Sequence, residues 1–469
     1  MYRSYRLLFI WCCVMVFTGS AKAQGSGHTG GRIRVSSILI TGNKRTKNYI
    51  ILREIHFKAG DSLNTDLLSQ DLKRARTQVY NTNLFTEVKV DSVALSDSSL
   101  SIRVQVKEKW YIYPTPQFQL ADRSFNEWIK TYHADFNRVV YGVKFAHYNF
   151  TGRRDQLRIY LLNGYARNIS ASYSNPFVNK SLTAGFGVSA GFTQNREIGT
   201  RTSYFNKIIN YKRAGFVRNA FNSSFSYNMR NGYFKTVSVG LGMNYINIED
   251  SISSYYNPKY FNSTKHVQLF SDLALSVSYL NTDNNNYPLT GRGYGITLSK
   301  RGLGFSGGIN NTALSGTVLK YISHPHNWYS SIQLSGIMMV PFKQAYINQR
   351  AVGYGNLSLR GLEVYVVDGV VAGVAKYTLS KKIVSFKLPM PFKIKTIPYL
   401  PFKIFAKTYA DAGYSYLPKD FNTRLNNRFL YTGGFGLDMV TLYDIVFKLE
   451  FSFNQLGEKG LFLHGKGGF

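Results

Sequence analysis

Few residues of this sequence have the types and spacing that catalysis requires. Gly304-Phe-Ser306-Gly-Gly308 fits the G-x-S-x-G pattern of a nucleophilic serine, but no strand-to-helix elbow is predicted around it. His324-Pro-His326 offers two imidazoles, and a zinc site needs further ligands. The glycine-rich stretches 353–355 and 433–436 lack the lysine and the following helix of a phosphate-binding loop. We therefore expect no enzyme activity, no cofactor and no metal.

The two cysteines, Cys12 and Cys13, offer no chemistry either, because they lie in a predicted signal peptide. Two arginines, the apolar run 7–17 and small residues ending at Ala23 follow one another in the order of a secretory signal cleaved after residue 23. The apolar run is shorter than the roughly 20 residues of a membrane anchor. The mature chain is then expected to hold no disulfide, thiolate metal site or cysteine nucleophile. Residues 24–32 are predicted to be a flexible lead-in.

The strongest polar candidate is Arg360. Glycines between residues 353 and 361 indicate a loop that turns sharply and packs closely. A guanidinium folded into such a loop keeps its proton, and a carboxylate can meet it with two parallel hydrogen bonds. Asp411 is the preferred partner, and Glu363 and Asp368 are alternatives closer in sequence. We expect a structural latch rather than a catalytic group; the alternative is an ordinary exposed loop arginine.

The elements that could position these residues divide the chain in two. Residues 33–109 are predicted to form a small domain in the order β-α-α-β-β, with one helical layer on a small sheet. Its expected elements are a strand over Val35–Ile40, helices over Thr46–Ile55 and Asn64–Tyr80, and strands over Thr86–Val93 and Leu100–Val106.

Beyond Pro114 and Pro116, taken as the boundary, the pattern has a period of two residues almost throughout. Residues 182–192 are typical: large apolar residues alternate with Gly, Ser and Thr, whereas a soluble sandwich would present charged residues on its polar face. No stretch after residue 24 approaches the length of a membrane helix, and a closed barrel satisfies every backbone group in lipid. We therefore predict that residues 110–469 form a transmembrane β-barrel of roughly 14 to 18 strands. The competing interpretation is a secreted all-β protein.

The net charge of +32 favours anionic partners. Lipid headgroups, lipopolysaccharide and acidic polypeptide all qualify. Nucleic acid is not expected as a partner, because the chain is exported and its charges are spread out.

Several motifs resemble those of the BamA/TamA superfamily of outer-membrane assembly and translocation barrels. The front unit is similar to one POTRA domain, and the match spans essentially the whole mature chain. The most specific motif, Leu359-Arg360-Gly361-Leu362, is similar to the family's loop motif of hydrophobic-Arg-Gly-aromatic, and Ala410-Asp411-Ala412-Gly413 looks like the strand motif whose acid meets that arginine. The other matching segments are Ile40-Thr-Gly42-Asn43, Leu84-Phe85-Thr-Glu-Val88, Asn149-Phe150-Thr-Gly152-Arg153, Asn175-Pro176-Phe177, Tyr287-Pro288-Leu-Thr-Gly291 and the terminal Phe469.

The resemblance implies a barrel of about 16 antiparallel strands and a latch made by Arg360, Gly361 and Asp411. It also implies a lateral seam between the first and last barrel strands that opens toward client strands. Glycines weaken strands, so Gly465, Gly467 and Gly468, next to Phe469, are candidate seam residues. In the POTRA unit a sheet edge that binds client polypeptide is expected at Ile40, Gly42, Leu84 and Phe85.

The sequence departs from the family pattern in showing one POTRA unit where several are usual, and Leu362 where an aromatic residue is common. The main hypothesis is a factor that assembles or translocates proteins in the outer membrane of a diderm bacterium, with its POTRA domain in the periplasm. Its partners would be unfolded outer-membrane or secreted polypeptides, outer-membrane lipid or lipopolysaccharide, and accessory lipoproteins. The alternative is a passive anion-selective channel or lipid conduit.

Overall fold

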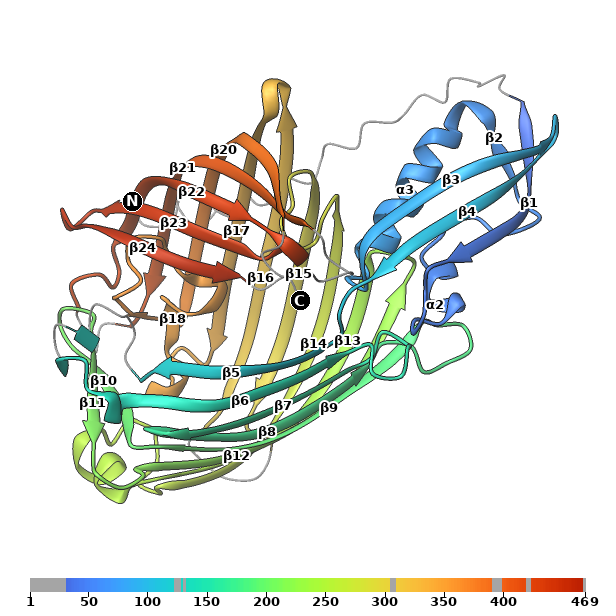
Figure 1. The fold of residues 1–469 in the computed structure, drawn as a ribbon. Coiled ribbons are helices and arrows are strands. Elements are labelled where there is room, and N and C mark those ends of the chain that lie inside the picture. Colours follow the sequence, from blue (N-terminus) through green and yellow to red (C-terminus); the bar gives the residue numbers. More distant parts are fainter. Residues whose placement is uncertain are drawn as a thin grey trace.

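The computed structural model describes residues 31–121, 128–129, 132–303, 309–389, 399–418 and 423–466. A small α+β domain lies against one rim of a large β-barrel (Figure 1). The predicted signal peptide, the Ser306 motif and the last three residues, Gly467, Gly468 and Phe469, lie outside the described residues.

The N-terminal domain is a four-stranded sheet with strand order β2-β1-β4-β3, packed against one long helix. Strand β1 runs parallel to β4, whereas the pairs β1–β2 and β3–β4 are antiparallel. The elements are β1 (Arg32–Thr41), α2 (Asn48–Leu52), β2 (Ser62–Asn64), the 3-10 turn η1 (Thr65–Leu67), α3 (Leu68–Tyr80), β3 (Phe85–Ser96) and β4 (Ser99–Glu108).

Two of these elements differ from the prediction. The first helix, α2, has five residues, because only Ile50 and Ile51 need to reach the core. The residues expected to begin the second helix form strand β2 and a 3-10 turn instead. There the Asn64 side chain accepts a hydrogen bond from the backbone N–H of Asp66 at 2.9 Å, which caps the turn ahead of α3.

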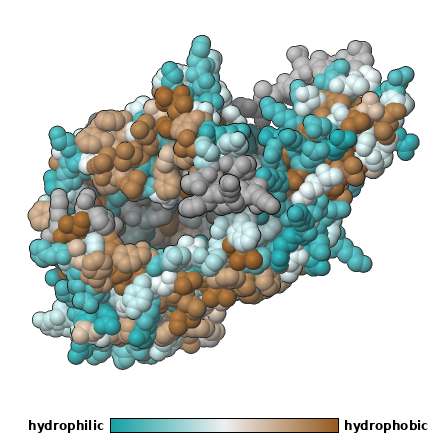
Figure 2. Space-filling view, in the orientation of Figure 1, coloured by the Kyte–Doolittle hydropathy of each residue, from teal (hydrophilic) through white to brown (hydrophobic). Residues whose placement is uncertain are grey.

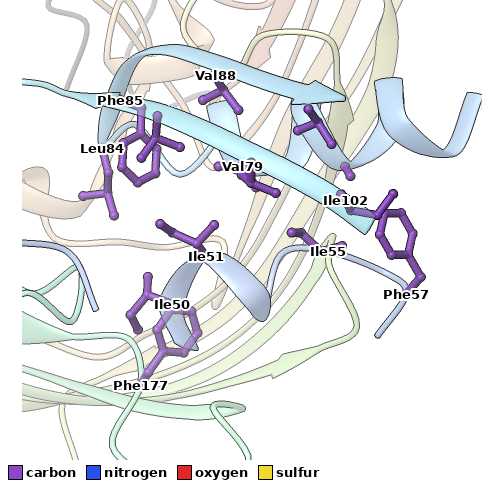
Figure 3. Close-up of a cluster of buried hydrophobic side chains, with 14 of the residues drawn as sticks. Ile50, Ile51, Ile55, Phe57, Val79, Leu84, Phe85, Val88, Ile102 and Phe177 are labelled. Carbon is purple, nitrogen blue, oxygen red and sulfur yellow. The ribbon is translucent and has the colours of Figure 1, made fainter. Parts of the chain in front are cut away.

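The hydrophobic core of this domain continues into the barrel rim. Figure 3 shows Ile50 and Ile51 of α2 beside Val79 of α3, with Phe177 approaching from a barrel turn. Phe177 is 2% exposed, and Tyr148 at the end of a barrel strand belongs to the same cluster. Burying these aromatic rings in a shared core is expected to hold the domain against the rim.

The barrel is one sheet of sixteen strands in which each hydrogen-bonded neighbour is antiparallel, so the expected strand number is confirmed. The strands are β5 (Ile112–Leu120), β6 (Val139–Tyr148), β7 (Gln156–Gly164), β8 (Ala166–Asn175), β9 (Ala184–Asn195), β12 (Arg218–Asn231), β13 (Lys235–Ile248), β14 (Val267–Thr282), β15 (Gly291–Arg301), β16 (Asn311–His324), β17 (Trp328–Val340), β20 (Val371–Pro389), β21 (Tyr399–Tyr416), β22 (Phe429–Val440), β23 (Val446–Asn454) and β24 (Lys459–Lys466).

The barrel wall carries apolar side chains outward, as the period of two predicts. In β12, Phe221, Phe225 and Tyr227 are exposed and alternate with Asn222 and Ser224. Figure 2 shows hydrophobic residues gathered over the strands and hydrophilic ones over the loops and turns. Within the described part of the chain, no helix is both long enough and apolar enough to cross a membrane.

The rim opposite the N-terminal domain carries the longer loops, which hold two small hairpin sheets. These are β10 (Glu197–Thr202) with β11 (Ile208–Lys212), and β18 (Arg350–Val352) with β19 (Val367–Asp368). The remaining short helices are η2 (Phe136–Arg138), the π-helical η3 (Ile252–Tyr256), η4 (Pro325–Asn327), η5 (Tyr346–Asn348), η6 (Gly355–Leu357) and η7 (Leu442–Asp444).

Pro114 and Pro116, expected to mark the domain boundary, lie inside the first barrel strand, β5. Proline is tolerated there because β5 is one end of the sixteen-stranded sheet and β24 is the other. Among the described residues no backbone pairing joins β5 to β24. A barrel that pairs every backbone group, as expected from the sequence, would need β5 to pair with β24. Over their described residues these two strands do not pair.

Candidate functional site

The loop between β17 and β20 folds back against the inside of the barrel wall and places Arg360 on Asp411 of β21. The Arg360 Nε donates to Asp411 Oδ2 at 2.9 Å, and Nη2 donates to Oδ1. The backbone N–H of Arg360 reaches the same carboxylate at 3.1 Å. The Asp411 side chain is fully buried, and the Arg360 guanidinium lies 4.0 Å from the centre of the Tyr409 ring. Asp411, the first choice among the three predicted carboxylates, is the one that the guanidinium contacts.

The neighbours of Arg360 explain how this loop packs. Leu359 and Leu362 are 1% and 3% exposed and join a core cluster with Val374 of β20. Gly361 has φ +82°, and a Cβ there would lie 2.8 Å from the Cβ of Ser452, so glycine is required. The aromatic residue that is common at position 362 in the resembling family is replaced by a leucine that fills the same cluster.

Polar contacts from this loop reach four of the last five strands of the sheet, namely β20, β21, β23 and β24. Arg360 Nη1 donates to Thr378 Oγ1 of β20 at 2.9 Å, in addition to its contacts on β21. The Gly361 carbonyl accepts a hydrogen bond from Asn454 Nδ2 of β23 at 2.8 Å. Glu363 accepts from the Gly361 N–H at 2.7 Å, and its carboxylate lies 3.6 Å from His464 of β24. The loop therefore contacts β24, the strand at the end of the sheet.

A buried network of ion pairs joins strands β21, β22 and β23. Lys407 of β21 lies 2.5 Å from both Asp438 of β22 and Glu450 of β23. Glu450 is also 3.4 Å from His464. These residues were missed in the sequence, although a signal was present: Asp438 follows Thr432, Gly434 and Gly436 at alternate positions of β22, on a face of small residues.

The seam between β5 and β24 is short of hydrogen-bond donors on the β5 side. The Tyr148 N–H donates to the Tyr111 carbonyl and the Ala121 N–H donates to the Arg138 carbonyl, so odd-numbered residues of β5 bond to β6. The even-numbered positions 112, 114, 116, 118 and 120 therefore turn their backbone groups toward the seam. Pro114 and Pro116 take two of these five positions and have no N–H to offer.

On the other side of the seam, the same reasoning assigns residues 459, 461, 463 and 465 of β24. The Asn454 N–H donates to the Glu458 carbonyl, so even-numbered residues of β24 bond to β23. Gly465 thus lies on the edge of β24 that is turned away from β23, and a Cβ there would meet no atom within 4 Å. A cavity of about 810 Å³ lies next to both strand ends and is lined by Ala121 beyond β5 and by Phe462 of β24.

An ion cluster anchors the N-terminal domain to the barrel rim. Glu54, after α2, is 1% exposed and accepts hydrogen bonds from Arg230 of β12 at 2.5 and 2.8 Å. Arg53 and Arg154 approach the same carboxylate at 3.9 and 4.0 Å. Burial lowers the pKa of Arg154 to about 10, with Glu54 acting in the opposite direction. One buried carboxylate thus serves three arginines.

Comparison with known proteins agrees with this architecture. Residues 33–109 match the POTRA family model, described as a surface antigen variable number repeat. No curated protein matches the chain. BamA from Haemophilus ducreyi lacking POTRA domains 1–3 is similar in structure, with a TM-score of 0.52, 16% identity, and coverage of 93% of this chain and 85% of that one.

Two further solved structures are similar. CdiB from Acinetobacter baumannii has a TM-score of 0.50 and 14% identity over 92% of this chain and 73% of its own. CdiB from Escherichia coli has a TM-score of 0.50 and 10% identity over 95% of this chain and 92% of its own. The fold is that of a BamA-like barrel behind a single POTRA domain.

Of the four POTRA residues predicted to form a client-binding edge, Leu84 and Phe85 are buried and Gly42 lies in the bend after β1. Leu84 and Phe85 are 3% and 0% exposed, so their side chains belong to the core. Gly42 has φ +90°, and a Cβ there would lie 2.0 Å from the Val106 carbonyl oxygen. Ile40 pairs with Val104 of β4 on one side, whereas β2 covers the other side of β1 only at Arg32–Arg34. Sequence alone did not distinguish edge from core because the strand order of the sheet was not known.

The loops on the rim opposite the POTRA domain are tied together by one side chain. Asn206, in the turn between β10 and β11, is fully buried. Its Nδ2 donates to the Val366 carbonyl at 3.0 Å and to Thr423 Oγ1 at 2.9 Å, and its Oδ1 accepts from the Leu425 N–H at 2.9 Å. The loop that carries Arg360 is therefore held at two points, by Asn206 and by Asp411.

The structure describes both histidines of the metal candidate, His324 and His326. Across the residues that the structure describes, no group of three or more His, Cys, Asp or Glu side chains is placed to hold a metal ion. His324 Nε2 is 2.7 Å from Ser330 Oγ.

Lys109, at the junction between the POTRA domain and β5, gives a pH-dependent prediction. Burial lowers its pKa to about 8 from 10.5, and its ammonium lies 5.4 Å from the centre of the Tyr443 ring. Between pH 8 and pH 10.5 the unfolded chain binds more protons than the folded one, so stability rises with pH across this window, by on the order of 3 kcal/mol. The measurement is the unfolding temperature at pH 7.5 and 9.5; Lys109→Met should be more stable at pH 7.5 and should lose most of the rise. An equal rise in both proteins would contradict this assignment.

Proposed function

We propose that this protein inserts polypeptides into, or translocates them across, the outer membrane. The barrel would span that membrane with the POTRA domain in the periplasm, and a client strand would pair with the exposed edge at the seam. The observation that carries the proposal is the β5 edge, which is unpaired among the described residues and lacks donors at Pro114 and Pro116. Such an edge exchanges its partner at low cost, and extended polypeptide binds to sheet edges by the same backbone pairing.

The POTRA domain supplies a place to receive the client before insertion. Strand β3 is an edge of its sheet. A groove of about 490 Å³ runs beside it and is lined by Leu68 and Leu72 of α3 and by Val90 of β3. Arg76 donates to the Val88 carbonyl at 2.9 Å and so occupies one acceptor of this edge. We propose that an extended client segment lies in this groove, in place of the buried residues expected from the sequence.

In this proposal the Arg360–Asp411 latch fixes the position of the loop. Arg360 and Asp411 hold the loop on β20 to β23, and the Glu363–His464 contact connects that loop to β24, one side of the seam. Loop position would then set how β24 presents its free edge. This role does not depend on which polypeptide is the client, because backbone pairing is independent of the client's sequence.

The proposal is tested with the mature protein in proteoliposomes and a urea-unfolded outer-membrane barrel as the client. The predicted mature chain has no cysteine, so pairs introduced at Ala121 and, in turn, Gly460 or Phe462, which line the same cavity, can be screened for a disulfide that locks the seam. Client folding should stop in the oxidised form and return on reduction. Equal folding in both forms would overturn the seam mechanism.

The alternative of a passive anion-selective channel is tested on the same proteoliposomes. Anion currents that are unchanged by the oxidised seam, together with no client folding, would favour the channel. Outer-membrane proteomics after depletion then separates general from dedicated roles: a broad fall in other barrels indicates a general assembly factor, and an unchanged barrel population indicates a dedicated exporter.

Replacing both seam prolines should close the barrel. Pro114→Thr with Pro116→Thr restores two N–H donors and is expected to stabilise the closed seam by about 1 to 3 kcal/mol. We expect a higher unfolding temperature and client folding slowed roughly tenfold. Pro401→Thr, in β21 and remote from the seam, is the control. Faster client folding in the double variant would show that the prolines do not keep the edge open.

A further inference from the structure

A second cavity lies between helix α3 of the POTRA domain and the barrel rim. Its volume is about 930 Å³. The POTRA side contributes Lys73, Arg74 and Gln78, and the barrel side contributes Arg154 and Arg230. The lining also includes Thr236 of β13 and Leu280 of β14.

The lining carries a strong positive excess. Six cationic residues line it against two acidic ones, Glu54 and Asp283, which leaves four positive charges in excess. Both acids are already engaged within the protein. Glu54 accepts from Arg230, and Asp283 Oδ1 accepts from the backbone N–H groups of Leu289 and Thr290 at 2.9 and 3.0 Å. The cationic residues are Lys73, Arg74, Arg154, Arg230, Arg292 and Lys320.

Gln78 independently indicates a ligand. It is 5% exposed, and neither its Oε1 nor its Nε2 has a hydrogen-bond partner among the described residues. A buried primary amide normally satisfies both groups, because an orphaned polar atom in the interior is costly. Gln78 follows Arg74 by one helical turn on α3, so the amide and the guanidinium lie on one face, toward the same cavity.

The cavity also has an apolar side. Phe177, Phe234 and Leu280 belong to its lining. Arg292 of β15 and Lys320 of β16 are cross-strand partners, so their side chains lie on the same face of the sheet. A ligand that joins a charged group to an apolar body would satisfy both parts of the lining.

We propose that this cavity binds a phosphate group of an anionic ligand, with guanidinium groups as its receptors and Gln78 as the hydrogen-bonding partner of a phosphate or ester oxygen. Arginine matches phosphate oxygens with paired N–H donors. The two sources of this chemistry are a phospholipid headgroup at the periplasmic leaflet and free phosphate. This site does not depend on the proposed assembly function, since it does not involve the seam and shares only Lys73 with the lining of the β3 groove.

The test uses the mature full chain in a neutral detergent and calorimetric titration with three probes: dihexanoyl-phosphatidylglycerol, inorganic phosphate and a short acidic peptide. We expect saturable binding of the lipid, weakened about tenfold or more by Lys73→Gln with Arg74→Gln. The matched control is Arg103→Gln with Lys107→Gln, which removes two exposed cations from β4 of the same domain. Gln78→Leu should weaken binding without lowering the unfolding temperature, because it removes an unpaired amide.

Each outcome has a definite meaning. Lipid binding that is lost in the α3 variant and kept in the control supports the site with a lipid source. Equal affinity for inorganic phosphate supports it with phosphate as the source. Tighter binding of the acidic peptide, no binding of either phosphate probe, or equal loss in the control variant would overturn the proposal.

Discussion

Arg360→Ala should unlock the loop from the barrel wall and produce the largest functional loss of any single substitution in the barrel. The substitution leaves the Asp411 carboxylate buried without its partner, and breaking a buried pair from one side costs about 3 to 5 kcal/mol. The measurements are the temperature at which the barrel loses its folded mobility in SDS gels and the rate of client folding in proteoliposomes. Both are expected to fall, and Arg360→Lys is expected to restore little, because lysine lacks the planar pair of donors.

Two comparisons distinguish a latch from general damage. The double variant Arg360→Ala with Asp411→Ala should lose less stability than the sum of the single variants, because neither charge is then left alone. Arg428, an exposed arginine next to β22, provides the matched control, and Arg428→Ala should be neutral. Additive losses in the double variant would show that the two residues act independently.

Glu54→Ala should loosen the POTRA domain from the barrel. Without this carboxylate, Arg53, Arg154 and Arg230 are left together in a buried site with no acid within ion-pair distance, and the expected cost is about 3 to 5 kcal/mol. We expect faster protease cleavage between the POTRA domain and β5, whereas the folded mobility of the barrel itself is retained. The measurement is limited proteolysis of the detergent-solubilised protein over time.

The control for this variant is Glu87→Ala in the same domain. The Glu87 side chain is 55% exposed and pairs only with Lys89 at 3.3 Å, so its removal should change little. Restored resistance in Glu54→Ala with Arg230→Ala would further indicate that the unpaired charge, rather than lost packing, loosens the domain. Unchanged cleavage in Glu54→Ala would mean that the shared core around Phe177 is sufficient to hold the domain.

The architecture was largely predictable because its signals are local. Alternating apolar and small residues along strands such as β9 and β13 follow directly from a wall with lipid on one side, and the structure has the expected sixteen strands. Helix α3 was predictable because Ala75 and Val79 share one face. Strand β2 was not, since three residues carry too little periodicity to be separated from the start of a helix.

The candidate site was predictable only where chain motifs mark it. Arg360 stood out through its glycine-rich loop, and Asp411 through a resembling strand motif. In contrast, Glu54 and Arg230 are 176 positions apart and lie in no shared pattern, so only the docking of the two domains brings them together. Pro114 and Pro116 were read as a linker signal, because the sequence does not reveal that β5 is the edge of its sheet.

The buried Asn206 amide restricts how the exposed face of this barrel can be re-engineered. From the turn between β10 and β11, it bonds to a residue that follows Arg360 in one loop and to residues between β21 and β22 in another. One side chain therefore holds three loops together. Epitope tags and affinity peptides inserted beside it would disturb all three loops at once. The adjacent Tyr204 and Phe205 side chains are exposed on the same turn, yet this position is a poor insertion point for labelling. The short turn after Asn231, at the opposite rim, has open space around Gly232 and is no better, because Arg230 and Tyr233 on either side of it contact Glu54 and Ile55.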